Sequence, residues 1–409
     1  MQPIIFDTDY GPFIDDGKII SCCFIVYQVK NPSSFVLVFY SVFATGLLLN
    51  SGDLLDLKFV VTTSENPLLS AKCVAKHLDL AGRSDIPVGA GQQFPPYKQR
   101  GGVCAVPGLV GFALESVCSD IDLPIHENGT EAIAKMIMES GRNDWWYIVV
   151  TGQSTLKALV DSYPVAASKI DTLIVMGGDW CSGFEPYPDV LSPVDETNIA
   201  CDPAAANDVL DASVSPFSHI YYVPVVMADT IAGKDYMKIV DAAESGTNAG
   251  AAATMDFYRA WTKAGRANSS LLIHLEAEEY DPEKESVPQF DSCAVMLALE
   301  LLDDENCEDR VELFKFHGVH FYEAGEGVTY PGTPRTAFSL HTGEEIPDLP
   351  DQCPSLTPFT FELEDTTEKE LPVMVALGYK SVKAKNHFFA DMAARMAGEQ
   401  PNCSSNRST

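Results

Sequence analysis

The sequence predicts an α/β protein with a doubly wound, mainly parallel sheet flanked by helices, in a single large domain. Short apolar runs of strand length alternate with segments of helical periodicity from the start of the chain to about residue 230. Most of these runs end in Gly, Thr, Asn or Asp. The 409 residues are 46% hydrophobic, which supplies enough apolar surface for a large core. Alternating strands and helices imply parallel strands joined by right-handed crossovers.

The predicted strands are runs of β-branched, aromatic and aliphatic residues that stop at turn-forming residues. The run at 85–91 is short and ends in a glycine turn, whereas the others are expected to be buried. The strands are predicted over residues 4–6, 59–63, 85–91, 147–152, 172–178 and 220–226.

The predicted helices show apolar residues at spacings of three and four. They cover residues 71–82, 131–140, 156–163 and 204–210, with a closing helix over 384–396. Residues 325–358 are rich in Gly, Pro and Thr and are expected to form a long surface loop. We therefore expect one domain over residues 1–397, followed by a disordered tail over 398–409.

Residues 18–50 contain the most apolar stretch of the chain. Polar residues between Lys30 and Ser34 divide it into runs far shorter than the ~20 residues that a membrane span requires. Two β-strands would suit its β-branched and aromatic residues.

Removal of residues 17–41 would join Asp16 directly to Val42. The result would be an acidic strand-to-helix turn followed by a helix with an apolar face. The codons implied at both ends are compatible with splice sites, so we interpret residues 17–41 as a translated intron. A genuine insertion is the alternative, and sequencing the transcript distinguishes the two.

The net charge of −31 argues against nucleic acid and anionic membrane surfaces as partners, because both would repel the chain.

The eleven cysteines include no CxxC pair, and an odd number fits poorly with a fully paired disulfide framework. Four glycosylation sequons would matter only on a secretory route. As the chain stands, with no signal peptide before its first strand, it is expected to be cytoplasmic. The secretory route would apply if the true N-terminus is missing.

Four carboxylates, those of Asp7, Asp9, Asp15 and Asp16, fall within ten residues directly after the first strand. Close carboxylates repel one another, and several oxygen ligands around one point suit a hard cation such as Ca²⁺ or Mg²⁺. The alternative is an acidic surface turn.

Polar residues also follow the other predicted strands. In doubly wound sheets, ligands bind beyond the carboxyl ends of the strands. The residues at the carboxyl ends of the predicted strands are Asp7, Asp9, Asn66, Thr151 and Gly177. Their shared position favours a functional site.

Seven patterns in a fixed order give the chain a family resemblance. They are Asp7-Thr8-Asp9-Tyr10-Gly11 with Asp15-Asp16, Thr62-Thr63-Ser64-Glu65-Asn66, Asp85-Ile86-Pro87-Val88-Gly89-Ala90-Gly91, Val150-Thr151-Gly152, Met176-Gly177-Gly178, Glu196-Thr197-Asn198-Ile199 with Asp202-Pro203, and Phe290-Asp291-Ser292-Cys293-Ala294-Val295. Over roughly residues 3–300 the chain resembles the inosine-uridine-preferring nucleoside hydrolase family.

The resemblance implies a Ca²⁺-dependent hydrolase that cleaves the N-glycosidic bond of ribonucleosides to ribose and free base. It implies that Asp9, Asp16 and Asp291 are calcium ligands, together with the backbone carbonyl of Thr151. It also implies that Asp15 is the general base that activates a calcium-bound water.

The same resemblance assigns the ribose hydroxyls to Asn66, Glu196 and Asn198. Amide and carboxylate groups together donate and accept the hydrogen bonds that such hydroxyls need. The alternative for Glu196 and Asn198 is an ordinary helix N-terminus, and Asp291 could be a simple N-cap. The expected partner is thus a small-molecule ribonucleoside, and a homo-oligomer is left open.

Two departures from the family pattern stand out. Phe290 occupies the position where many members have a histidine that protonates the leaving base, and two extra residues separate Gly11 from Asp15. A non-catalytic member that binds calcium or ribosides is therefore one alternative function. A phosphatase that uses Asp7 and Asp9 as a DxD pair is the other, although it does not account for Asp15, Asp16 or Asp291.

Overall fold

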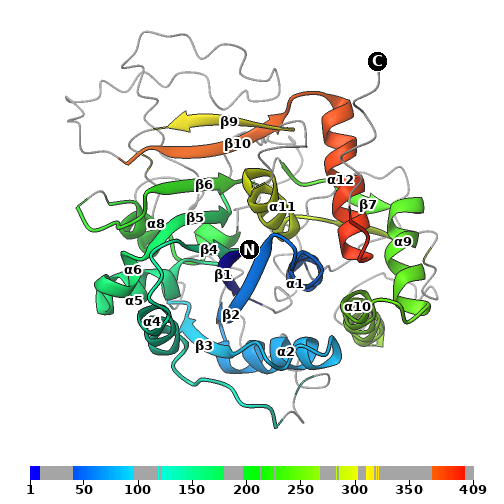
Figure 1. The fold of residues 1–409 in the computed structure, drawn as a ribbon, viewed down its shortest axis with the longest axis horizontal. Coiled ribbons are helices and arrows are strands. Elements are labelled where there is room, and N and C mark those ends of the chain that lie inside the picture. Colours follow the sequence, from blue (N-terminus) through cyan, green and yellow to red (C-terminus); the bar gives the residue numbers. More distant parts are fainter. Residues whose placement is uncertain are drawn as a thin grey trace.

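The computed structural model describes residues 1–9, 40–95, 118, 122–178, 197–211, 213–224, 227–267, 282, 285–302, 310–316, 319, 321 and 371–400. Its centre is an eight-stranded sheet in the order β3-β2-β1-β4-β5-β6-β10-β9 (Figure 1). Neighbouring strands pair in parallel except β9, which is antiparallel to β10. The strands are β1 (Gln2–Thr8), β2 (Leu55–Ser64), β3 (Val88–Gln93), β4 (Trp145–Val149), β5 (Ile170–Met176), β6 (His219–Val223), β9 (Val311–Phe316) and β10 (Val373–Tyr379).

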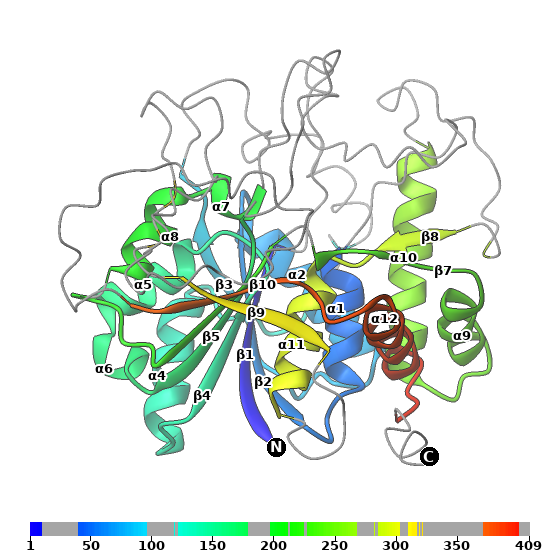
Figure 2. The same cartoon turned by 90° about the horizontal axis from the view of Figure 1, so that it is seen from above.

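Helices cover both faces of the sheet (Figure 2). Each face has its own buried apolar core, which is the arrangement of a doubly wound fold. On one side lie α1 (Tyr40–Leu49), α2 (Pro67–Leu80), α9 (Gly233–Glu244), α10 (Ala249–Ala267), α11 (Asp291–Leu302) and α12 (Val382–Met396). On the other lie α4 (Gly129–Ser140), α5 (Ser154–Ser162), α6 (Pro164–Ala167) and α8 (Pro203–Leu210). The fold class predicted from the sequence is confirmed.

The remaining elements are small. The helix α7 (Thr197–Ala200) precedes α8, and β7 (Thr230–Ala232) pairs antiparallel with β8 (Ser286–Pro288). Each strand and helix predicted from the sequence is present, with at least one end shifted. The strands β7–β10 were not predicted, because they are short or come from the less regular C-terminal third.

The helix predicted to start at Val42 is α1, and it begins earlier, at Tyr40. The sequence suggested one apolar face, but residues 41–48 of α1 are all buried, with α10, α11, α12 and β2 packed against the helix. Residues 10–39 lie outside the described part of the chain, so the interpretation of residues 17–41 as an intron or an insertion stays a prediction. The loop predicted over 325–358 and most of the tail predicted over 398–409 also lie outside it.

A disulfide between Cys73 and Cys118 joins α2 to the chain that follows β3, and Cys201 is also disulfide-bonded. Sequence analysis could not pair these two cysteines, because they are 45 residues apart and no local pattern links them. Cys293 at the start of α11 is a buried free thiol, and burial raises its pKa well above the usual range.

His77 on α2 is completely buried beside Thr254 and Phe257 of α10, with 3.2 Å between its Nε2 and Thr254 Oγ1. Burial lowers its pKa from 6.5 to about 3. The unfolded chain binds this proton near pH 6.5 and the folded chain does not. Stability present above pH 6.5 is therefore lost as the pH falls toward 3.

We expect this histidine to remove about 2 kcal/mol of unfolding free energy between pH 7.5 and pH 5. In urea titrations of His77→Gln, the difference in unfolding free energy between the two pH values should be smaller by that amount. His219→Gln, at an exposed histidine that begins β6, is the control and should leave it unchanged. Equal pH dependence in the wild type and in His77→Gln would contradict the prediction.

Candidate functional site

The carboxyl ends of β2, β1, β4 and β5 lie side by side, because these four strands are neighbours in the sheet. The residues that follow them therefore share one edge. Asp9 follows β1, Asn66 follows β2 and Thr151 follows β4. Asp291, from a distant part of the sequence, joins them at the first turn of α11.

Asp9 and Asp291 meet around the hydroxyl of Ser41 at the start of α1. The Ser41 Oγ lies 2.7 Å from Asp291 Oδ2 and 3.1 Å from Asp9 Oδ1. All three side chains are buried. A hydroxyl has one hydrogen to donate, so it cannot satisfy both carboxylates at once. The sequence predicted the two carboxylates, but it did not single out Ser41 as their partner.

Burial raises the pKa of the Asp9 carboxyl well above its usual range, and the charges of Asp291 and Glu65 raise it further. Glu65, the residue after β2, is partly buried, and burial raises its pKa to about 7. The sequence placed Glu65 in a pattern beside Asn66 but gave it no role. Its position directly after a strand was the signal that could have included it. Three acidic groups therefore interact at this edge, and positive charge there would stabilise their ionised forms.

Asp7 lies within β1, two residues before Asp9, and its side chain is fully buried. Its carboxyl accepts hydrogen bonds from Thr63 Oγ1 at 2.7 Å and Tyr147 Oη at 2.9 Å, which ties β1 to β2 and β4. Burial raises its pKa to about 8. A carboxyl enclosed in this way cannot reach a substrate phosphate, so the structure argues against the DxD phosphatase alternative.

Thr151 is buried, and its hydroxyl donates to the backbone carbonyl of Thr63 at 2.8 Å. The hydroxyl is thus engaged, and the backbone carbonyl is the group that the family resemblance assigns to calcium. The next residue must be glycine: a Cβ at Gly152 would lie 2.6 Å from the Phe94 ring and 3.2 Å from the carbonyl oxygen of Asn198. This close approach brings α7 against the end of β4.

Asn198 is buried in α7, and its amide donates to the backbone carbonyl of Met176, at the end of β5, at 3.1 Å. Asn66 is exposed and caps α2, with Leu69 N donating to its Oδ1 at 3.2 Å. Both residues therefore lie at the predicted edge. Phe290 is buried immediately before Asp291. The predicted site residues Asp15, Asp16 and Glu196 lie outside the described part of the chain.

The model of the family described as "Inosine-uridine preferring nucleoside hydrolase" matches residues 41–390. The chain belongs to this nucleoside hydrolase family. The matched region begins at Ser41, so the acidic cluster from Asp7 to Asp16 lies before it. It includes Thr151, Asn198 and Asp291.

The curated nucleoside hydrolases similar to this chain include the pyrimidine-specific ribonucleoside hydrolase RihA of Escherichia coli. It is 30% identical over 177 residues, which are 42% of this chain and 51% of the relative. The chain thus spans about half the length of the curated relatives it matches.

Solved nucleoside hydrolases share the fold. The structure of a purine-preferring ribonucleoside hydrolase from Gardnerella vaginalis aligns with a TM-score of 0.55 at 15% identity, covering 97% of this chain and 99% of the other. An inosine-guanosine nucleoside hydrolase aligns with a TM-score of 0.59 at 14% identity, covering 98% and 99%. At these identities the likeness concerns the fold.

The oxygen ligands at this carboxyl edge of the sheet suit a calcium ion. Carboxylate and carbonyl oxygens are the ligands that Ca²⁺ prefers, and the buried carboxylates of Asp9 and Asp291 share one hydroxyl hydrogen. Asp9 forms no ion pair with a lysine or arginine among the described residues. Within those same residues, however, no three His, Cys, Asp or Glu side chains gather into a metal-binding cluster. The described carboxylates therefore do not by themselves make up a complete cation site.

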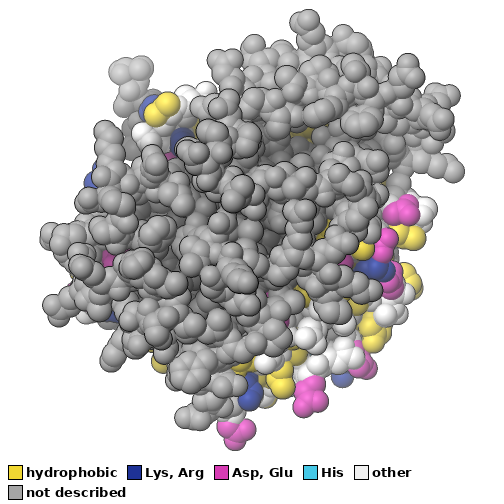
Figure 3. Space-filling model, turned by 180° about the vertical axis from the view of Figure 1, so that it is seen from behind, with side chains coloured by type: hydrophobic (Ala, Val, Ile, Leu, Met, Phe, Trp, Pro, Cys, Tyr) yellow, Lys and Arg dark blue, Asp and Glu magenta, His cyan; other side chains and the backbone are white. Residues whose placement is uncertain are grey.

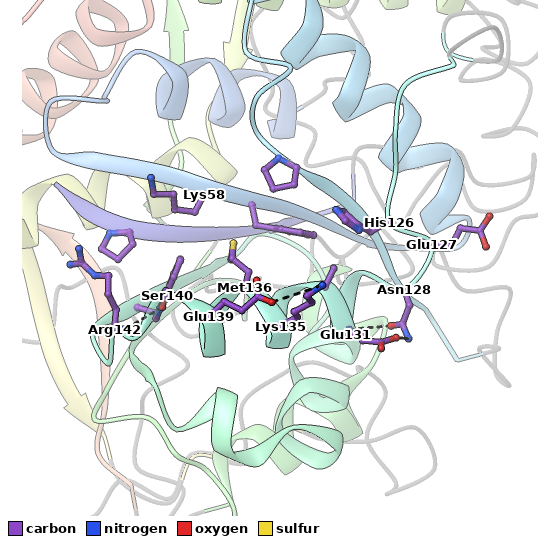
Figure 4. Close-up of a pocket in the computed structure, with 15 residues that line it drawn as sticks. Lys58, His126, Glu127, Asn128, Glu131, Lys135, Met136, Glu139, Ser140 and Arg142 are labelled. Atoms are coloured by element: carbon purple, nitrogen blue, oxygen red, sulfur yellow. Dashed lines mark hydrogen bonds and ion pairs between the residues drawn. The ribbon is translucent and has the colours of Figure 1, made fainter.

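A surface hollow elsewhere is unrelated to this edge (Figure 4). It is lined by Pro3, Lys58 and Trp145, at the amino ends of β1, β2 and β4, and by residues of α4.

In the described part of the face shown in Figure 3, acidic, basic and apolar side chains are mixed and do not mark a binding patch. In the described part of the chain, no helix combines the length and the apolar character needed to cross a membrane.

Proposed function

We propose that this chain hydrolyses the N-glycosidic bond of ribonucleosides and requires calcium for this activity. Its membership of the nucleoside hydrolase family supports the reaction class. The meeting of the Asp9 and Asp291 carboxylates at the carboxyl edge of the sheet is the observation that supports the cation. The proposed ligands are Asp9, Asp16, Asp291 and the backbone carbonyl of Thr151.

Glycosidic cleavage passes through an oxocarbenium-like state that needs an activated water and nearby negative charge. Asp15 is proposed as the base that removes a proton from that water. Calcium, when bound, would lower the pKa of a water and orient the ribose hydroxyls. Asn66, Glu196 and Asn198 are proposed to hold the ribose by hydrogen bonds, so that the bond to be cleaved faces the base.

The test is a ribose-release assay with purine and pyrimidine nucleosides, with and without a calcium chelator. The full chain and a variant lacking residues 17–41 should be assayed in parallel. We expect ribose release that stops on chelation and returns with added Ca²⁺. Release that persists without calcium would contradict the metal requirement. Calcium binding without release from any nucleoside by either form would favour the non-catalytic alternative.

The proposed compartment follows from the disulfide. Disulfides form and persist in oxidising compartments, so Cys73–Cys118 favours the secretory route over the cytoplasm. Secretion would also allow the sequons to be glycosylated. A glycosidase-sensitive mass shift of the protein from its native source would support this route, and free thiols at both cysteines would contradict it.

A further inference from the structure

Asn128 begins the sequon Asn128-Gly129-Thr130, and its side chain is exposed at the start of α4. It is the N-cap of that helix: Glu131 N donates to its Oδ1 at 3.2 Å, and its Nδ2 donates to Glu131 Oε2 at 3.1 Å. Nδ2 carries two hydrogens, so a sugar can replace one of them while both cap contacts remain. The folded chain is therefore compatible with a glycan on Asn128.

Packing fixes the two residues that follow Asn128. A Cβ at Gly129 would lie 2.8 Å from the carbonyl oxygen of Ala90. Thr130 is only 3% exposed, and Gln92 Nε2 donates to its Oγ1 at 3.3 Å. No such contact requires asparagine at the cap, because aspartate or serine caps a helix equally well. Helix capping and packing thus leave the choice of Asn128 unexplained.

Asn128 also lines the surface hollow of Figure 4, which follows one face of α4 from this N-cap to Ser140, the last residue of the helix. The volume of the hollow is about 770 Å³, within the range of about 300–1,000 Å³ that small-molecule sites occupy. Phe59, Met136 and Trp145 contribute apolar surface to it. An apolar hollow of this size gains stability when a ligand displaces its water.

The charged side chains around the hollow occur in both signs and in pairs. A bound ion would compete with these pairs, whereas the hydroxyls of a neutral ligand can both donate and accept beside them. A sugar has this chemistry, because its ring presents C–H groups on its faces and hydroxyls at its edge. The pairs are Lys58 with Asp56 at 2.8 Å, Lys135 with Glu139 at 3.9 Å and Arg142 with Asp144 at 2.7 Å.

We propose that Asn128 carries an N-linked oligosaccharide whose first sugars lie in this hollow along α4. The inference rests on the secretory compartment proposed above and is independent of the hydrolase activity. The donor is an oligosaccharide linked to a polyprenyl diphosphate. The bond from sugar C1 to the diphosphate oxygen breaks, a bond from C1 to Asn128 Nδ2 forms, Nδ2 loses a proton, and the polyprenyl diphosphate leaves.

The first measurement is the occupancy of Asn128 in protein from its native source. Enzymatic removal of N-glycans in water enriched in heavy oxygen converts a glycosylated asparagine into a labelled aspartate, which mass spectrometry locates. We expect the label at Asn128. Asparagine before glycine also deamidates spontaneously, so a sample kept in the same water without enzyme is the control.

The two proposals can fail separately in this measurement. An unmodified Asn128 in protein whose Cys73 and Cys118 are disulfide-bonded would overturn the glycan site and leave the secretory compartment standing. Free thiols at both cysteines together with an unmodified Asn128 would overturn both. Neither result depends on ribose release, so failure of the hydrolase function is a distinct outcome.

The second measurement tests whether the sugars lie in the hollow. The full chain is produced in eukaryotic cells with an added secretion leader, and its Tm is measured before and after enzymatic glycan removal. Asn128→Asp keeps the helix cap but accepts no sugar, so the same treatment of this variant measures the effect of the other sequons. Removal should lower the Tm of the full chain by about 1–3 °C more than that of Asn128→Asp, because apolar surface is re-exposed.

Two substitutions on α4 locate the contact. Met136→Glu places a charge in the hollow and should abolish the extra loss of Tm, while Asn128 stays glycosylated. Met138→Glu is the matched control, because Met138 is 48% exposed and does not line the hollow. It should keep the extra loss.

Equal Tm losses in the full chain and in Asn128→Asp would overturn the placement of the sugars, and this comparison holds even if Met136→Glu fails to fold. An extra loss that persists in Met136→Glu would overturn it as well. Sedimentation of the full chain tests a second copy as the occupant. Dimerisation that Met136→Glu abolishes would assign the hollow to that copy and overturn the proposal.

Discussion

Asp291→Asn is expected to abolish calcium-dependent ribose release and to weaken calcium binding. The substitution keeps the shape of the side chain, and an amide can still accept a hydrogen bond from Ser41 Oγ, which lies 2.7 Å away. Only the negative charge at the proposed calcium site is lost. Loss of several kcal/mol of electrostatic stabilisation corresponds to a fall in kcat/KM on the order of 10³-fold.

The measurement uses whichever of the two forms, full chain or deletion, releases ribose more rapidly. Asp235→Asn is the matched control, because Asp235 lies in the first turn of α9 as Asp291 does in α11, but away from the site. It should leave both calcium affinity and kcat/KM unchanged. Unaltered calcium affinity in Asp291→Asn would show that this carboxylate is not a ligand.

Arg310→Met is expected to destabilise the folded chain by about 3–5 kcal/mol. Arg310 precedes β9, and its Nε donates to Glu300 Oε1 of α11 at 2.9 Å, while a second nitrogen pairs with Asp391 of α12. The side chains of Arg310 and Glu300 are only 8% and 9% exposed. Removal of the arginine would leave the Glu300 charge buried without this partner. Urea unfolding at pH 7 measures the loss.

The double variant Arg310→Met with Glu300→Leu should recover most of the lost stability, because neither charge then remains buried. The exposed pair Arg83–Asp85, with a 2.8 Å contact, supplies the control. Arg83→Met should cost less than about 1 kcal/mol. A cost for Arg310→Met as small as that of Arg83→Met would contradict the prediction.

The sequence predicted the parallel part of the sheet because its signals are local. Residues 59–63 and 172–178 are apolar runs with turn residues behind them, and the structure confirms them as parts of β2 and β5. The strands β9 and β10 were missed, because their pairing joins segments on either side of a long intervening stretch of chain. Such pairing depends on contacts that are distant in sequence.

The same distinction applies to the site. Asp9, Asn66 and Thr151 could be predicted, because polar residues after parallel strands share one edge of a sheet. The patterns also pointed to Asp291, but they did not show what it contacts. Glu65 was overlooked, although it influences the pKa of Asp9. The assignments of Asp15, Asp16 and Glu196 stay predictions.

By itself, the sequence determined the fold class and the group of polar residues at the strand ends, because periodicity and turn residues act between neighbours in the chain. Only the tertiary structure decided that Ser41 lies between Asp9 and Asp291, and that Cys73 pairs with Cys118. These contacts depend on how α1 and α11 pack against each other and on where α2 lies. Such packing is set by the shapes of buried surfaces across the whole core, which no local pattern contains.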